Sequence, residues 1–343
     1  DVLRVASGVL LNNQIPEPEV LPAPKLLECV LQNCKGRVDD CVAPYLAVAL
    51  ERLKTCELTY LKDLLVQIVA NCLWYDASLT LDILVKNGAL GTALQTWFAM
   101  LNDRTRGGDK RRHHRREHDK KVCILGLVAL IQTPAPNLPA EVAAGMGQIC
   151  SAVVSLLVDL RTQEKERKEF EAKNPGGFYG HGWGSDDDDF GGDEDLGEDD
   201  EDDEEPVLDP TELAAMAKRA QSVNPFRRRG GDDEDDDEDE DFDDGMLTDD
   251  ENFTSPIDDI DPFTLFAETV TVVQSADAGR FQALAGGLDA GGQQTMQELV
   301  AYAGIRREEL AKEKAEEEAK KAAAQAKAGP GAIPVQRAGH ENH

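Results

Sequence analysis

The sequence predicts an all-helical protein, a stack of helical hairpins interrupted by a long disordered acidic loop. Apolar residues recur at helical spacing through residues 21–173 and again after Pro262. No stretch keeps the two-residue alternation of a β-strand for long. Between the two helical parts the composition becomes densely acidic, and such a segment has too little apolar surface to fold.

Residues 1–173 form the first predicted region. Successive apolar stripes fall within residues 38–53, 58–72 and 142–160, and glycines at Gly36 and Gly88 are placed to form left-handed helix caps. The longest apolar run, residues 122–131, indicates a buried helix. It is far shorter than the roughly 18 residues that a membrane span needs, so we predict no such span.

The predicted helices recur with a regular interval. They start near Pro22, Glu57, Ala89 and Glu117, at steps of about 28 to 35 residues, which is typical of helical-hairpin repeats that stack into a solenoid. A compact helical bundle would give the same apolar stripes and remains the alternative.

A basic loop at residues 103–117 interrupts this pattern. Its cations and neighbouring histidines are Arg104, Arg106, Lys110, Arg111, Arg112, His113, His114, Arg115 and Arg116. Three interpretations stay open: a solvated loop, a nuclear localisation signal, or an internal ligand on which the acidic loop folds back when no basic partner is bound.

Residues 174–261 combine a glycine-rich linker (176–184) with the acidic loop. Of the formal charge of −31, −30 falls between Asp186 and Asp261, where 35 acidic residues face 5 basic ones. Only residues 211–222 have the composition of a short helix. This charge opposes binding to nucleic acid and favours basic proteins as partners.

Two clusters of the acidic loop carry the predicted contacts to a basic partner. The proposed binding residues are Asp186, Asp187, Asp188, Asp189, Asp199, Asp200, Glu201, Asp202 and Asp203, and then Asp232, Asp233, Glu234, Asp235, Asp236, Asp237, Glu238, Asp239, Glu240 and Asp241. Ser185 and Thr248 each precede a carboxylate by three residues, the spacing that an acid-directed kinase prefers. We expect phosphorylation there to add to the negative charge.

The third region, residues 262–328, returns to helical spacing. Pro262 suits a first helical turn, and Phe263, Phe266 and Val270 follow on one face. Beyond Ile305 the sequence is rich in Glu, Lys and Ala, as expected of a solvated helix. Residues 329–343 are predicted to be a disordered tail.

We expect no catalytic residues, metal site or cofactor. The six histidines lie in predicted loops, at a helix start or in the tail, and none stands beside a candidate nucleophile. The seven cysteines lack metal-binding spacing and sit among apolar helical neighbours, so they are expected to be reduced thiols, as in the cytosol or nucleus. Because the chain opens at Asp1 without an initiator Met, we expect a fragment of a longer protein.

Several segments, in order, resemble the importin-beta (karyopherin-beta) family of nuclear import receptors, specifically its importin-seven/eight branch. They are residues 26–30 (LLECV), 34–37 (CKGR), 49–53 (ALERL), 118–127 (HDKKVCILGL), 258–262 (DDIDP), 280–284 (RFQAL) and 287–288 (GL). The resemblance implies HEAT repeats, import of basic cargo such as ribosomal proteins and histones, contact with nucleoporin phenylalanine-glycine repeats, and shuttling between cytoplasm and nucleus. It implies Ran-GTP binding through a region N-terminal to these residues.

One departure concerns a further partner. The tail after Gly329 lacks the phenylalanine-glycine element that can recruit importin-beta, which counts against that partnership. The alternative to a transport receptor is an acidic protein resembling a histone chaperone, or a scaffold, that binds basic partners without transport. Ran-GTP separates the two, because only a receptor releases its cargo in response to it.

Overall fold

A computed structural model describes residues 1–105, 111–173 and 255–327 of the chain. Within these ranges the protein is all-helical, as the sequence predicts, and the only extended pairing among them is a single bridge between Arg104 and Arg111. Three predicted features lie outside the described residues: the glycine-rich run, the short helix expected at 211–222 and the tail at 329–343.

The helices follow one another with short connections. Their bounds are α1 Val2–Leu10, α2 Glu17–Val20, α3 Pro22–Asn33, α4 Asp39–Leu53, α5 Thr59–Tyr75, α6 Ala77–Lys86, α7 Leu90–Asn102, α8 Glu117–Gln132, the 3-10 turn Ala135–Asn137, α9 Ala140–Ala144, α10 Met146–Lys173, α12 Pro262–Ala276, α13 Ala278–Ala285 and α14 Ala290–Lys327. The predicted starts at Pro22, Glu57, Ala89 and Glu117 agree with α3, α5, α7 and α8 to within two residues.

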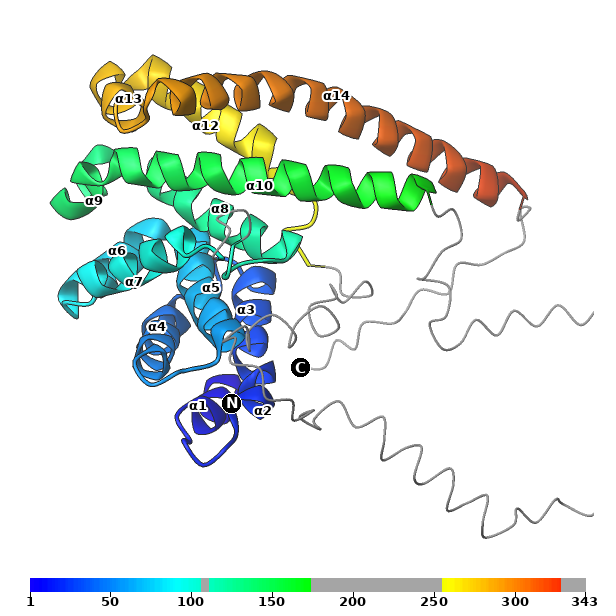
Figure 1. The fold of residues 1–343 in the computed structure, drawn as a ribbon. Helices are drawn as coiled ribbons and strands as arrows, with labels where there is room; N and C mark the ends of the chain where they lie inside the picture. Colours follow the sequence, from blue (N-terminus) through cyan, green and yellow to red (C-terminus); the bar gives the residue numbers. More distant parts are fainter. Residues whose placement is uncertain (106–110, 174–254, 328–343) are drawn as a thin grey trace, which may run out of the picture. The chain divides into compact units, whose positions relative to one another are not determined.

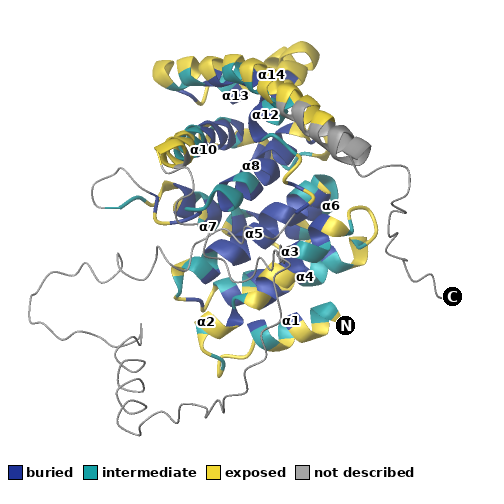
Figure 2. Cartoon of the chain, turned by 90° about the vertical axis from the view of Figure 1, so that its right-hand side faces the viewer, coloured by how far each residue is buried: buried dark blue, intermediate teal, exposed yellow. Residues whose placement is uncertain are grey.

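Helix neighbours follow chain order, as expected for a solenoid. Helix α1 packs on α3, α3 on α5, α5 on α8, and α8 on both α10 and α12, with α14 against α10 and α12 at the end of the stack (Figure 1). Buried residues run through the middle of this stack, whereas α14 is exposed over much of its length (Figure 2). Within these residues the packing favours stacked repeats over a compact bundle.

The central helices α5 and α8 are buried on nearly all sides. Residues 122–131 of α8 all belong to the core, as the apolar run predicts. Gly126 lets α8 approach α5 closely, because a Cβ built there would lie 2.8 Å from the Ala70 Cα. The contact between these two helices therefore requires glycine at this position.

The predicted glycine cap is present between α6 and α7. Gly88 has a φ of +63°, and the Ala89 amide donates to the Leu84 carbonyl at 2.9 Å. This is the Schellman pattern, in which glycine takes the left-handed conformation that other residues avoid. The stripe predicted over 142–160 is in fact divided at Gly145 between α9 and α10, although its apolar residues are buried.

Residues 255–327 return to the helices of the first region. Phe263 and Phe266 of α12 are buried, Thr269 accepts a hydrogen bond from Gln132 of α8 at 2.8 Å, and the Arg280 guanidinium donates to the Ile131 carbonyl at 2.6 Å. The predicted start of the C-terminal helices at Pro262 coincides with the first residue of α12. Residues 255–261 were assigned to the disordered loop, yet Ile257 is only 2% exposed and belongs to the core.

The cysteines are free thiols, as predicted. Cys56, Cys72, Cys123 and Cys150 are buried, and the other three are partly buried. No helix among the described residues has the length and apolar character needed to cross a membrane.

Candidate functional site

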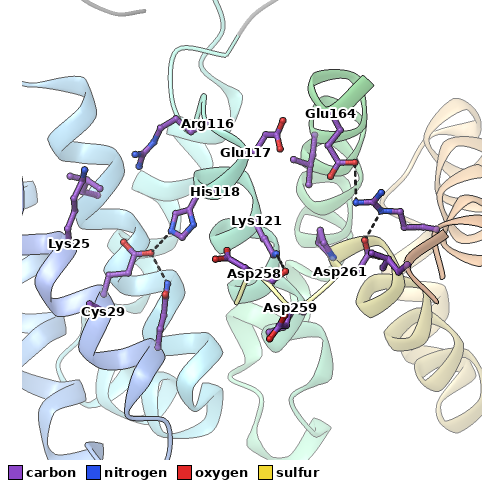
Figure 3. A pocket seen from close by; sticks show the side chains of 18 of the residues that line it. Lys25, Cys29, Arg116, Glu117, His118, Lys121, Glu164, Asp258, Asp259 and Asp261 are labelled. Carbon is purple, nitrogen blue, oxygen red and sulfur yellow. Dashed lines mark hydrogen bonds and ion pairs between the residues drawn. The ribbon is translucent and has the colours of Figure 1, made fainter. Parts of the chain in front are cut away.

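A groove of about 780 Å³ lies between α3, the start of α8, α10, residues 258–262 and α14 (Figure 3). Its walls combine a few apolar side chains with charges of both signs. The charged and titratable residues are Lys25, Glu28, Arg116, Glu117, His118, Lys121, Glu164, Asp258, Asp259, Asp261, Arg306 and Lys314.

A hydrogen-bonded network around Glu28 closes one side of the groove. The Glu28 carboxylate, 7% exposed, accepts hydrogen bonds from Gln32 at 2.9 Å and from Asn71 at 3.1 Å. His118 Nε2 lies 3.2 Å from the same carboxylate oxygen. Three helices, α3, α5 and α8, therefore meet at one buried carboxylate.

Burial opposes the protonation of His118, but the hydrogen bond to Glu28 and the charges of Glu28 and Asp119 outweigh it. The pKa of His118 is raised above 6.5 as a result. The nearby Arg116 guanidinium opposes this rise.

Residues 255–261 form a short segment, which we call the clasp, that is bonded to four helices. The Ser255 hydroxyl bonds the Gln32 side-chain oxygen on α3, and Lys121 of α8 donates to the Asp258 carbonyl at 2.9 Å. Asp261 caps α12 by accepting from the Thr264 amide at 2.8 Å, and its other oxygen accepts from Arg306 of α14 at 3.1 Å. The chain is therefore fixed to the helical stack as soon as it leaves the acidic segment.

Arg306 connects the clasp to α10. Besides Asp261, its guanidinium lies 3.7 Å from Glu164. Burial alone would lower the pKa of Arg306, but Glu164 and Asp261 raise it. For Glu164, burial raises the pKa of the carboxyl group, and the charge of Arg306 opposes that rise.

The basic loop differs from the prediction, because much of its described part is packed into the protein. Arg111 is 6% exposed and is bound by Asp159, the Leu101 carbonyl and, at 2.7 Å, the Ser155 hydroxyl. Arg116 donates to the buried Asp119 at 2.6 Å. Because both guanidinium groups are bound inside the protein, they do not agree with the interpretation of a solvated loop or of an internal ligand for the acidic loop. Arg106 and Lys110 lie outside the described residues.

Two histidines of this loop are buried rather than solvent-exposed. His113 Nδ1 lies 2.5 Å from Asp63, whose other oxygen accepts from the His114 amide at 3.0 Å. His114 has a φ of 53°, and burial lowers its pKa. Asp63 thus holds the loop against α5, an anchoring that charge counting alone cannot reveal.

Burial shifts the pKa of several nucleophilic side chains among the described residues. Burial raises the pKa of Cys56 and Cys150 to about 12, so neither thiol is a thiolate near neutral pH. Burial lowers the pKa of Lys120 to about 8, but its amine is held by the Arg115 carbonyl and Gln163. Within the described ranges no group of three His, Cys, Asp or Glu residues is arranged to hold a metal ion.

All the carboxylates predicted to bind a basic partner, from Asp186 to Asp241, lie outside the described residues, as do Ser185 and Thr248. The groove and the clasp were not foreseen as a site. Their signal in the sequence was a pair of apolar residues, Ile257 and Ile260, close to the end of the acidic segment, and the Ser255-Pro256 pair before them.

The chain is similar to importins over most of its length. It is 38% identical over 315 residues to the importin beta-like SAD2 homolog of Arabidopsis thaliana. The aligned residues make up 92% of this chain and 29% of that protein. It is 28% identical to importin-8 of Danio rerio (89% of this chain, 28% of the relative) and 27% identical to importin-8 of Homo sapiens (83% and 26%). The chain is thus similar in sequence to the importin-7/8 branch of the importin-beta family.

The chain spans less than a third of the length of these curated relatives. No protein-family model matches it, and no solved structure does. The similarity to the SAD2 homolog extends over nearly all of the chain, so it takes in both the helical stack and the acidic segment.

Proposed function

We propose that the chain is part of a nuclear transport receptor that carries basic proteins, such as ribosomal proteins and histones, into the nucleus in a Ran-dependent cycle. The observation that supports this most is the similarity to importins over 92% of the chain. The helical stack would act as the frame. The acidic clusters at 186–203 and 232–241 would attract the cargo.

The remaining partners follow from the same proposal. Ran-GTP would bind through repeats N-terminal to these residues, and nucleoporin phenylalanine-glycine repeats would carry the receptor between cytoplasm and nucleus. The proposed role is binding and transport rather than catalysis. Importin-beta is a weaker candidate partner, because residues 329–343 carry no phenylalanine.

The attraction of cargo rests on charge density. Residues 232–241 are ten successive carboxylates, and their negative potential attracts a Lys/Arg-rich surface. Such binding is strong at low ionic strength and weak at high ionic strength, because salt screens exposed charges beyond about 10 Å at 0.1 M.

The test uses a longer chain that carries these residues together with the N-terminal repeats, bound to a lysine-rich histone. Ran loaded with a non-hydrolysable GTP analogue should displace the histone, whereas Ran-GDP should not. If neither form of Ran changes histone binding, the transport proposal fails, and an acidic histone-chaperone-like or scaffold role explains the charge.

A further inference from the structure

The clasp contains a serine in an unusual setting. Ser255 is followed directly by Pro256. Ser255 is only 5% exposed, and its hydroxyl donates to the side-chain oxygen of Gln32. Its amide donates to the Asp258 carboxylate at 2.6 Å. One hydroxyl thus fixes the first described residue after the acidic segment to helix α3.

Ser255, Ile257 and the hydrogen bond from Lys121 to the Asp258 carbonyl hold this part of the clasp. Pro256, Asp258 and Asp259 are exposed, and the backbone-to-backbone hydrogen bonds are local, from the Asp258 amide to the Ser255 carbonyl at 2.9 Å and from the Ile260 amide to the Ile257 carbonyl at 3.0 Å. Segments with few buried side chains and few hydrogen bonds to other elements open more readily than the helices beside them. Opening exposes the hydroxyl in an extended Ser-Pro sequence, because the residue before proline avoids the helical conformation.

The closed clasp has no place for a phosphate. Gln32 bonds both Ser255 and, at 2.9 Å, the carboxylate of Glu28, so a phosphate on Ser255 would face Glu28 across a single side chain. The Asp258 carboxylate stands on the other side. A phosphate carries about −1.5 to −2 charges near neutral pH, and repulsion by the buried Glu28 carboxylate and the exposed Asp258 carboxylate opposes closure.

We propose that Ser255 is a phosphorylation site for a proline-directed kinase, and that its modification releases the clasp from helix α3. In the reaction, the Ser255 Oγ forms a bond to the γ-phosphorus of ATP on the kinase, and the bond from that phosphorus to ADP breaks. The hydroxyl proton passes to the catalytic carboxylate of the kinase. The switch lies where the described chain resumes after the acidic segment, so phosphorylation frees residues 255–259 from helix α3.

The chain provides its own control. Thr133-Pro134 is the other Ser/Thr-Pro pair in the sequence. Thr133 ends helix α8, is 3% exposed and bonds the Ala129 carbonyl at 2.8 Å, so reaching it requires opening of the core helix. A kinase that acts on the opened clasp should therefore modify Ser255 and leave Thr133 unmodified.

The first experiment treats the whole chain with a purified proline-directed kinase and ATP and locates phosphate by mass spectrometry. We expect phosphate on Ser255, none on Thr133, and none at this position in Ser255→Ala. Gln32→Ala removes the partner of the hydroxyl, and the rate at Ser255 should rise about fivefold, the effect of losing one buried hydrogen bond. Absence of phosphate at Ser255 in both the unaltered chain and Gln32→Ala would overturn the proposal, and so would equal labelling of Thr133.

The second experiment measures amide hydrogen exchange at Asp258 and Ile260. Phosphorylation should speed their exchange at least about tenfold and leave residues 122–131 of α8 protected. Ser255→Ala, which loses the hydroxyl without gaining charge, should show a smaller change. Unchanged exchange in the phosphorylated chain would show that the clasp stays closed and would refute the switch.

Discussion

At the residue scale, buried charged groups are held by specific partners. Asp119 is 1% exposed and accepts from Arg116 at 2.6 Å and from Gln67 at 2.8 Å. Burial would raise the pKa of Asp119, but the Arg116 guanidinium lowers it below its ordinary value. Both groups therefore stay charged inside the protein, because their attraction offsets the free-energy cost of removing them from water.

We predict that Asp119→Asn destabilises the chain by about 3 kcal/mol, because it leaves the Arg116 guanidinium without its carboxylate. Urea denaturation followed by circular dichroism measures this change. Asp82→Asn is the control, since Asp82 is 72% exposed and lies 3.9 Å from Lys86. It should leave the midpoint unchanged. Equal midpoints for both variants would contradict the assignment of Asp119 as a buried anchor.

The pH dependence of stability should carry the signature of His118. Because the pKa of His118 in the folded chain is above 6.5, protonation stabilises the fold below 6.5, and this contribution is lost as the pH rises through the folded-state pKa. The difference in free energy of unfolding between the unaltered chain and His118→Gln should therefore be larger at about pH 6 than at about pH 9.

Comparison with His118→Gln cancels the opposite effect of His114, whose pKa is lowered by burial and which is present in both chains. Urea denaturation at the two pH values gives the difference directly. A difference that grows with rising pH would show that Glu28 does not stabilise the imidazolium.

At the element scale, the helices were largely predictable and the connections were not. Local periodicity is enough to identify α4 and α8, and Gly88 signals its own left-handed cap. The basic loop was misjudged because burial of Arg111 depends on Asp159, which is 48 residues away in the sequence. The clasp was missed for the same reason, since Ser255 finds its partner Gln32 across 223 residues.

A glycine tests the contact between the two central helices. Gly126→Ala places a methyl group within 2.9 Å of Ala70 atoms, so α5 and α8 must separate, and we expect a loss of about 2 kcal/mol of stability. Gly304→Ala on α14 is the matched control, because nothing lies within 4 Å of a Cβ there. It should stabilise the chain by up to about 1 kcal/mol through higher helix propensity. Thermal denaturation of both variants checks the opposite signs.

At the scale of the whole molecule, charge and packing are separated along the chain. The described residues account for one packed unit formed by residues from both ends of the sequence, while the acidic clusters from Asp186 to Asp241 lie outside them. Composition predicts that the acidic runs contribute no core, because they lack apolar residues, and this stays a prediction. Composition gave no sign that residues 255–261 pack on the stack, since Ile257 and Ile260 are too few to give a helical period.

The central claim is that the helical stack is the frame and the acidic segment binds basic proteins. Deletion of residues 186–250, which keeps the clasp, tests it by titration of a lysine-rich histone at low and high salt. We predict unchanged helical circular dichroism, at least about tenfold weaker binding at low salt, and loss of most of the salt dependence. Unchanged affinity at low salt in a folded deletion chain would contradict the claim and assign basic-protein binding to the helical stack itself.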